Sequence, residues 1–192
     1  RSSFYAIVHH NDLPDERISP TGGKSGGALQ ELTSFVYGAA LIYLLGGDLT
    51  GNEVGAAAKN VIGIAAGLLD GCELTSLKGA LMARGTREIS RLIEAMGGDP
   101  RSAYGLAHLG DYEATVFSPH SHNRAFGEAL ARGESYTQLA EGAATAQALC
   151  RLSDRLNVEL PICRAVCAVI YDHADPRQAI FTLFDRALKR EI

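Results

Sequence analysis

The sequence lacks both an excess of basic residues and a long apolar segment. Its formal net charge is -4 at pH 7, so it carries none of the basic surplus typical of nucleic-acid-binding domains. The most apolar stretch, residues 54–69, contains Lys59 and Asn60 and is shorter than the roughly 18–20 residues of a membrane-spanning helix. Residues 1–12 have no apolar core of the kind that a signal peptide needs. We therefore expect no nucleic-acid partner, no membrane span and a cytoplasmic location.

Several motifs of common binding sites are also missing. The four cysteines form no C-x-x-C pair, which argues against a zinc ribbon and predicts small core residues in a reducing compartment. The dinucleotide fingerprint G-x-G-x-x-G is absent. Residues 19–27 lack the first glycine of a phosphate-binding loop, because Ile18 stands in its place, and we predict a flexible turn there.

A short histidine-rich stretch is the strongest candidate for a metal site. His120 and His122 have H-x-H spacing, and with His108 and Asp111 they could ligate zinc. Proline and serine residues flank the two histidines in a predicted surface loop, and no second ligand cluster accompanies them. Because a zinc site needs a complete and closely placed ligand set, we predict no metal site.

The overall pattern predicts a mainly α protein that begins with a short α/β segment. Hydrophobic residues make up 46% of the chain, which is enough for a core. Residues 4–10 and 40–45 have the composition of buried strands, and residues 26–38 between them predict a helix. A strand–helix–strand unit is typical of the edge of a parallel sheet. Turn residues at 46–52 mark the end of this segment.

After residue 52 the spacing of the apolar residues is helical. Glycine and proline at positions 97–100 end the second long helix, and Asp175 followed by Pro176 is typical of a helix start. Either Thr75 or Ser76 is predicted to cap the second helix. The predicted helices cover residues 55–69, 75–96, 103–109, 124–132, 135–156, 162–171 and 176–189.

The first of these helices raises a chemical question, because it places Lys59 and Asn60 among small apolar residues. Glycines and alanines on both sides would let another backbone or a ligand approach the helix closely. One interpretation is a tight helix crossing from which the ammonium group of Lys59 reaches solvent. The other is a partly desolvated lysine with a lowered pKa that can transfer a proton.

Several segments, in the right order, resemble landmarks of the NAD(P)-dependent sn-glycerol-3-phosphate dehydrogenases. The stretch AAAKNVIGIAAGLLDG resembles the lysine–asparagine helix of that family, and SHNRAFG resembles its S-R-N-R-x-x-G segment. The others resemble R-G-x-x-E-x-x-R-L, G-L-x-G-L-G-D-L-x-x-T and two later landmarks, at residues 80–100, 105–115, 140–142 and 157–162. The resemblance implies a helical, 6-phosphogluconate-dehydrogenase-like C-terminal domain preceded by the last part of a Rossmann domain.

The same resemblance implies an organisation and an activity. Residues 1–50 are expected to be the tail of a nucleotide-binding α/β domain, and residues 51–192 an all-helical, substrate-binding catalytic domain. The implied reaction interconverts sn-glycerol 3-phosphate and dihydroxyacetone phosphate with NAD or NADP, in glycerol-3-phosphate metabolism and phospholipid biosynthesis. The implied partners are this phosphorylated small molecule and a second copy of the chain in a homodimer.

Site residues are implied position by position. Lys59 matches the proton-transferring lysine, and Asp111 matches the aspartate that contacts the glycerol part and helps to orient it, so both are expected to be catalytic. Substrate binding is implied for Lys59, Asn60, Asp111, Thr115, Ser121, His122 and Asn123. Contact with the nucleotide cofactor is implied for His122, Arg124 and Glu141.

The main departure from the family pattern is His122, which stands where the family has an arginine. An arginine would give a permanently charged, two-pronged contact to phosphate, and histidine cannot. Arg124 lies two positions away and could replace it. One alternative is therefore a related dehydrogenase for a different hydroxy substrate. Another is a non-catalytic helical oligomerisation module derived from the family.

Overall fold

A computed structural model of the protein describes residues 47–185. The predicted strands at 4–10 and 40–45 and the helix at 26–38 lie outside the described residues. Within them, short turns separate the longer helices: η1 (Thr75–Leu77), η2 (Pro100–Tyr104), η3 (Leu109–Asp111) and the π turn η4 (Glu113–Phe117). The longer helices are α3 (Leu49–Gly71), α4 (Lys78–Ala95), α5 (His122–Arg132), α6 (Glu141–Leu156), α7 (Pro161–Tyr171) and α8 (Pro176–Phe184).

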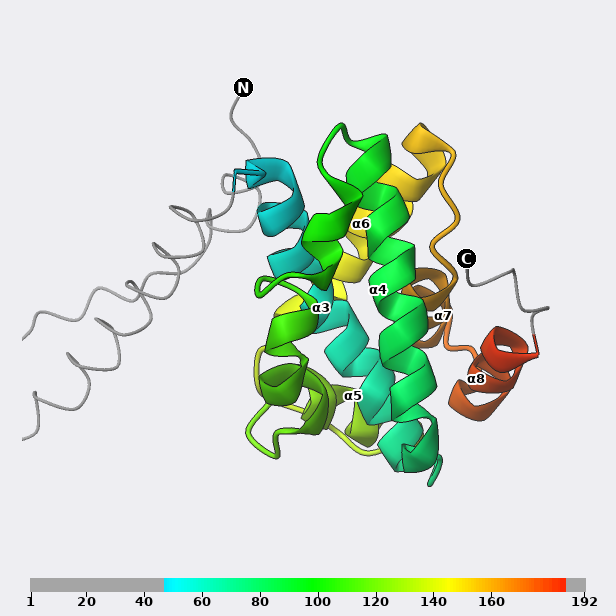
Figure 1. Cartoon of the computed structure of the whole chain (residues 1–192). Coiled ribbons are helices and arrows are strands. Elements are labelled where there is room, and N and C mark those ends of the chain that lie inside the picture. Colours follow the sequence, from blue (N-terminus) through cyan, green and yellow to red (C-terminus); the bar gives the residue numbers. More distant parts are fainter. Residues whose placement is uncertain (1–46, 186–192) are drawn as a thin grey trace, which may run out of the picture. The chain divides into compact units, whose positions relative to one another are not determined.

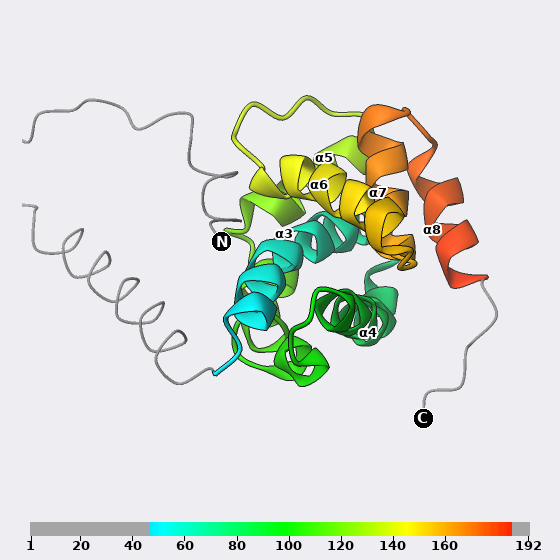
Figure 2. The same ribbon diagram turned by 90° about the horizontal axis from the view of Figure 1, so that it is seen from above.

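Helix α3 is the centre of the described domain. It contacts α4, α5, α6, α7 and α8, and Figures 1 and 2 show it enclosed by the surrounding helices. Every residue from Val61 to Leu69 is buried, so this part of α3 is apolar on all sides. A helix of this kind is stable only when other elements cover it completely. No helix of residues 47–185 is long and apolar enough to cross a membrane.

Helices α3 and α5 touch through glycines. A Cβ atom on Gly67 would lie 1.9 Å from the carbonyl oxygen of Arg124, and one on Gly127 would lie 2.1 Å from that of Ile64. Neither distance leaves room for a side chain, so both positions require glycine. The close approach of another backbone, expected from the small residues of α3, is confirmed.

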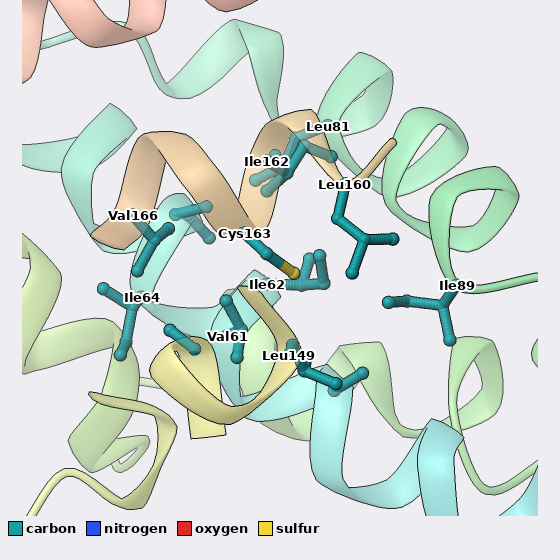
Figure 3. Close-up of a cluster of buried hydrophobic side chains, with 14 of the residues drawn as sticks. Val61, Ile62, Ile64, Leu81, Ile89, Leu149, Leu160, Ile162, Cys163 and Val166 are labelled. Carbon is teal, nitrogen blue, oxygen red and sulfur yellow. The ribbon is translucent and has the colours of Figure 1, made fainter. Parts of the chain in front are cut away.

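Large aliphatic side chains fill the space between α3 and its neighbours on the other side. Figure 3 shows Ile62 of α3 close to residues from α4, α6 and α7. The labelled residues Leu81, Ile89, Leu149 and Ile162 are at most 1% exposed. Burying each such side chain contributes roughly 1.5–3 kcal/mol. This core fixes the position and the rotation of α3, and therefore the direction in which its polar residues point.

Several predicted helix bounds are wrong. Helix α3 begins at Leu49, not at residue 55. The helix predicted for residues 103–109 is replaced by the short turns η2 and η3. Helix α4 begins at Lys78 after the η1 turn, and neither Thr75 nor Ser76 caps it. Helix α6 begins at Glu141, not at residue 135. The apolar pattern misled the prediction there, because the ring of Tyr136 packs on Phe126 of α5 at 5.6 Å instead of continuing a helix.

Candidate active site

Lys59 lies near the middle of α3, and its ammonium group forms an ion pair with the carboxylate of Asp111 in η3. The two side chains are 24% and 37% exposed, so the pair is half-buried and open to a ligand. Burial lowers the pKa of Lys59, and the carboxylate of Glu141 opposes part of that shift. The lysine is therefore paired as well as partly desolvated, and it does not simply extend into solvent.

Thr115 of η4 and Asn123 of α5 pack against Gly63, which lies one turn after Lys59 on α3. A Cβ atom on Gly63 would be 2.8 Å from Cγ2 of Thr115 and 3.3 Å from Cβ of Asn123. The hydroxyl group of Thr115 donates a hydrogen bond of 2.9 Å to the carbonyl oxygen of Asp111. This bond ties the buried threonine to the backbone of the residue that pairs with Lys59.

The first turn of α6 completes this polar cluster. The backbone N–H of Gly142 donates to the Oδ1 atom of Asn123 at 2.9 Å. A Cβ atom on Gly142 would lie 2.7 Å from the carbonyl oxygen of Asn60, so α6 approaches α3 closely at this point. Glu141 precedes Gly142 and is exposed, and its charge acts on the ammonium group of Lys59.

His122 lies at the start of α5, at the edge of a hollow of about 500 Å³. Its Nδ1 atom is 3.2 Å from the hydroxyl oxygen of Tyr136, and both residues line the hollow together with Ser121 and His120. Ser121 is the N-cap of α5, and its Oγ accepts from the backbone N–H of Arg124 at 3.3 Å. The sequence offered no signal for Tyr136, because its role depends on how residues 133–140 fold back onto α5.

Arg124 points away from this hollow. Its guanidinium group donates to the carboxylates of Asp70 and Glu128, both at 2.8 Å, and to the carbonyl oxygen of Ser118 at 3.1 Å. The side chain is only 15% exposed. Arg124 is thus held in an ion-pair network at the C-terminal end of α3. In this arrangement it does not replace the arginine that the family pattern has at position 122.

Two buried residues, His108 and Tyr112, connect the elements that carry Lys59 and Asp111. The Nδ1 atom of His108 is 2.9 Å from the carbonyl oxygen of Gly55, one turn before Lys59, so it donates there. Its Nε2 atom then accepts from the hydroxyl group of Tyr112 at 2.7 Å, next to Asp111. Neither side chain is exposed. Burial lowers the pKa of His108 to about 4, so the imidazole is neutral beside the ammonium group.

The position of His108 differs from the one expected for a surface ligand. The side chain of His108 is fully buried and hydrogen-bonded to Gly55 and Tyr112. His120 and His122 are exposed. Across residues 47–185, no three His, Cys, Asp or Glu side chains are grouped so that they could hold a metal ion. The spacing of four residues between His108 and Tyr112, typical of one helical face, is a signal that could have indicated their contact.

The assembled site combines an acid–base group, a carboxylate partner and neutral hydrogen-bonding groups. A half-buried ammonium group can donate a proton to an oxygen that gains negative charge, and the resulting amine can take it back. The Oδ1 atom of Asn123 is bonded to Gly142, which leaves its amide nitrogen as the end that can donate to a ligand. Such a set suits the reduction of a carbonyl group on a polar substrate.

Comparison with known proteins identifies the family to which the described region is similar. The family model described as "NAD-dependent glycerol-3-phosphate dehydrogenase C-terminus" matches residues 48–181. A glycerol-3-phosphate dehydrogenase [NAD(P)+] of Prosthecochloris aestuarii is 41% identical over 153 residues, covering 76% of this chain and 46% of that protein. The enzyme of the same name from Deinococcus radiodurans is 43% identical over 148 residues, covering 75% and 45%.

A solved structure shares the fold as well as the sequence. The crystal structure of glycerol-3-phosphate dehydrogenase from Coxiella burnetii superposes with a TM-score of 0.70 at 32% identity, covering 73% of this chain and 46% of that one. The chain thus spans about half the length of the relatives that it matches. With the family model covering most of the chain, the protein belongs to the family of NAD-dependent glycerol-3-phosphate dehydrogenases, within the region that forms their C-terminus.

Proposed function

We propose that this chain is the substrate-binding part of an enzyme that interconverts sn-glycerol 3-phosphate and dihydroxyacetone phosphate with NAD or NADP. The observation that carries the proposal is the half-buried ion pair of Lys59 with Asp111. Both belong to segments that resemble the family, and the fold brings them together from positions 52 residues apart. NAD or NADP is the cofactor named for the family's relatives, and when bound it supplies or accepts the hydride.

Lys59 is proposed to manage the proton of the reaction. When the ketone is reduced, its oxygen becomes an alkoxide, and the ammonium group stabilises that charge and gives up a proton. In the reverse direction the neutral amine takes the proton from the alcohol. Burial lowers the pKa of Lys59, which makes its proton easier to release. Asp111 holds the Nζ atom in place through the ion pair.

The buried His108–Tyr112 pair is proposed to position these two groups. Its two hydrogen bonds, of 2.9 Å and 2.7 Å, span from α3 to the turn that carries Asp111. Because both partners are buried and rigidly packed, the pair holds α3 and η3 in one register. The neutral state of His108 also avoids a second positive charge close to Lys59.

Substrate and nucleotide contacts are proposed from the same cluster. Asn60, Thr115, Ser121, His122 and Asn123 are proposed to contact the substrate. His122 and Glu141 are also proposed to contact the nucleotide. The remaining parts of the proposal rest on the family relationship alone. They are a division at residue 50, with residues 1–50 belonging to a nucleotide-binding α/β domain, and a homodimer located in the cytoplasm.

A second candidate function is the reduction of a related substrate that lacks the phosphate group. The observation that favours it is the pair of His122 with Tyr136, at a position where the family pattern has an arginine. Arg124 is held by Asp70 and Glu128 and offers no replacement charge. The ring nitrogens of an imidazole and the hydroxyl group of a phenol can hydrogen-bond a substrate hydroxyl group as readily as a phosphate oxygen.

The deciding experiment measures oxidation of NADH and NADPH by the full-length protein that contains this chain. Dihydroxyacetone phosphate and dihydroxyacetone are compared as acceptors. Rapid turnover of the phosphorylated acceptor, lost in Lys59→Ala, supports the first function. Preference for dihydroxyacetone supports the second. A folded full-length protein that oxidises neither cofactor with either acceptor contradicts both.

A further inference from the structure

Two cysteines on neighbouring helices lie closer together than their sequence positions indicate. Cys150 of α6 and Cys167 of α7 are 17 residues apart, and their Sγ atoms share a hydrogen bond of 3.2 Å. Both are free thiols and both are partly exposed. Nothing in the proposed reaction uses them, because it takes place around Lys59. We propose that Cys150 and Cys167 are a site of reversible oxidation, at which a small-molecule disulfide converts the two thiols into a disulfide bond between α6 and α7.

The geometry requires little movement. The S–S bond of a disulfide is about 2.0 Å long, so the sulfur atoms need to approach by about 1.2 Å. Helices α6 and α7 follow each other in the chain through a turn at residues 157–160 and pack against each other. Rotation about the Cα–Cβ bonds of two partly exposed side chains can supply this approach without separating the helices.

The two thiols differ in reactivity, which gives the reaction an order. The hydrogen bond with Cys167 and the guanidinium group of Arg164 lower the pKa of Cys150, against the effect of its burial and of the carboxylates of Glu88 and Asp154. The same hydrogen bond and burial raise the pKa of Cys167. The thiolate is the attacking form of cysteine, so Cys150 reacts first and Cys167 second.

The other two cysteines provide internal controls. Cys163 is fully buried, and burial together with the nearby carboxylate of Glu88 raises its pKa well above the ordinary value. Cys72 is also buried, and burial raises its pKa as well. Both are therefore expected to remain thiols under conditions that oxidise the partly exposed pair Cys150 and Cys167.

The chemistry is two successive thiol–disulfide exchanges. The Cys150 thiolate attacks one sulfur atom of the small disulfide, whose S–S bond breaks and releases one small thiolate. Cys167 then loses its proton to solvent and attacks the Sγ atom of Cys150, which expels the second small thiolate. Two protein thiols are oxidised, and one small disulfide is reduced to two thiols. The new bond fixes α7 to the helix whose first turn carries Glu141.

The test uses the full chain and needs no dehydrogenase activity. The reduced protein is incubated with oxidised glutathione, its remaining thiols are alkylated under denaturing conditions, and intact mass and peptide maps are recorded. We expect two of the four cysteines to escape alkylation, and one cross-linked peptide pair that contains Cys150 and Cys167. The rate should not depend on protein concentration, because the bond forms within one chain.

Single substitutions separate the two steps. Cys167→Ser should accumulate a stable glutathione adduct on Cys150, and Cys150→Ser should slow the modification of Cys167 at least about tenfold. Cys72→Ser is the matched control and should oxidise like the unchanged protein. Circular dichroism confirms that each variant is folded. The proposal is overturned if all four cysteines are still alkylated after a folded sample has been incubated with oxidised glutathione, or if a cross-link involves Cys72 or Cys163.

Discussion

Two lysine–carboxylate pairs lie along α3, one near the middle of the helix and one at its C-terminal end, and their surroundings differ. Among residues 47–185, Asp111 is the one carboxylate that forms an ion pair with Lys59, at a half-buried position. Lys78 pairs with Asp70, whose carboxylate also accepts from Arg124 and from the hydroxyl group of Thr75. The side chains of Lys78 and Asp70 are only 7% and 11% exposed.

The difference separates a structural ion pair from the pair that is proposed to take part in the reaction. The ammonium group of Lys78 has further partners in the carbonyl oxygen of Val116, at 3.0 Å, and the ring of Phe117, at 5.4 Å. Burial alone would raise the pKa of Asp70, but the hydrogen bonds from Lys78 and Arg124 lower it. A fully partnered pair of this kind gains nothing from binding a ligand. The Lys59–Asp111 pair is partly exposed and can form further hydrogen bonds with a ligand. Burial lowers the pKa of Lys59, so its ammonium group releases a proton more readily.

The sharpest test of this contrast is to remove each ammonium group in turn. In Lys59→Met of the full-length protein, kcat should fall by a factor of about 10² to 10⁴, which is the usual contribution of a general acid–base group. Lys78→Met should change kcat only a few-fold, because its ammonium group touches no reacting atom. Steady-state kinetics with saturating cofactor measures both. Equal losses in the two variants would contradict the assignment of Lys59.

The same two variants should have the opposite order in stability. Lys78→Met removes one of the cationic partners of the buried Asp70. We expect the free energy of unfolding to fall by about 3–5 kcal/mol. The loss should lie near the lower limit, because Arg124 still pairs with Asp70. Lys59→Met should change it by no more than about 1 kcal/mol, since that pair is half exposed. Urea unfolding at neutral pH measures the difference. A larger loss in Lys59→Met would argue against the contrast.

As the pH falls, the surroundings of Lys59 should lose stability before those of the Lys78–Asp70 pair. The pKa of His108 is about 4 in the folded protein against 6.5 for an ordinary histidine, so the unfolded chain binds a proton first. The contribution of His108 is complete above pH 6.5, and up to about 3 kcal/mol is lost as the pH falls to 4. The contribution of Asp70 persists to lower pH, because its folded pKa lies below 3.8.

The measurement for this prediction is a difference between two proteins. Burial raises the pKa of Glu88 to about 7, so its contribution changes with pH in the opposite direction and partly hides that of His108. In His108→Gln the group no longer titrates. Subtracting its stability from that of the unchanged protein at each pH should leave a term that declines between pH 6.5 and 4. A constant difference would show that His108 is not held neutral by the fold.

A smaller effect is expected from Tyr112→Phe. This variant keeps the packing but removes the hydroxyl group that donates to Nε2 of His108, leaving a buried acceptor unsatisfied. The free energy of unfolding should fall by about 1–2 kcal/mol. If the pair also positions Lys59 and Asp111, kcat of the full-length protein should fall while KM for the ketone stays within two- to threefold. Unchanged kcat would limit the pair to a structural role.

The smallest effect is expected at the rim of the Asp70 network. Arg132 pairs with Glu128 one turn away on α5, and its side chain is 49% exposed. Arg132→Ala should lower the free energy of unfolding by only about 0.3–0.5 kcal/mol, because an exposed pair gains little in water. Thermal unfolding in low and high salt measures it. A loss comparable to that of Lys78→Met would mean that the network extends further than Asp70, Lys78 and Arg124.

Local signals predicted much of this fold, and they failed where a contact between distant residues overrides them. Helices α5, α7 and α8 begin within two residues of their predicted starts, because capping residues and proline act locally. The start of α6 was misplaced because Tyr136 has an apolar partner in Phe126 that no local pattern reveals. Thr75 and Ser76 do not cap α4, because they belong to the η1 turn that precedes it.

The sequence by itself determined the family and the central helix that carries Lys59, since motifs and apolar periodicity are properties of neighbouring residues. Only the tertiary structure decided which groups meet. It placed Lys59 against Asp111, turned Arg124 to Asp70 and brought Cys150 to Cys167. These pairs are 17 to 54 residues apart in the chain. Their contacts follow from how helices cross on a packed core, and that depends on the shapes of all the side chains between them.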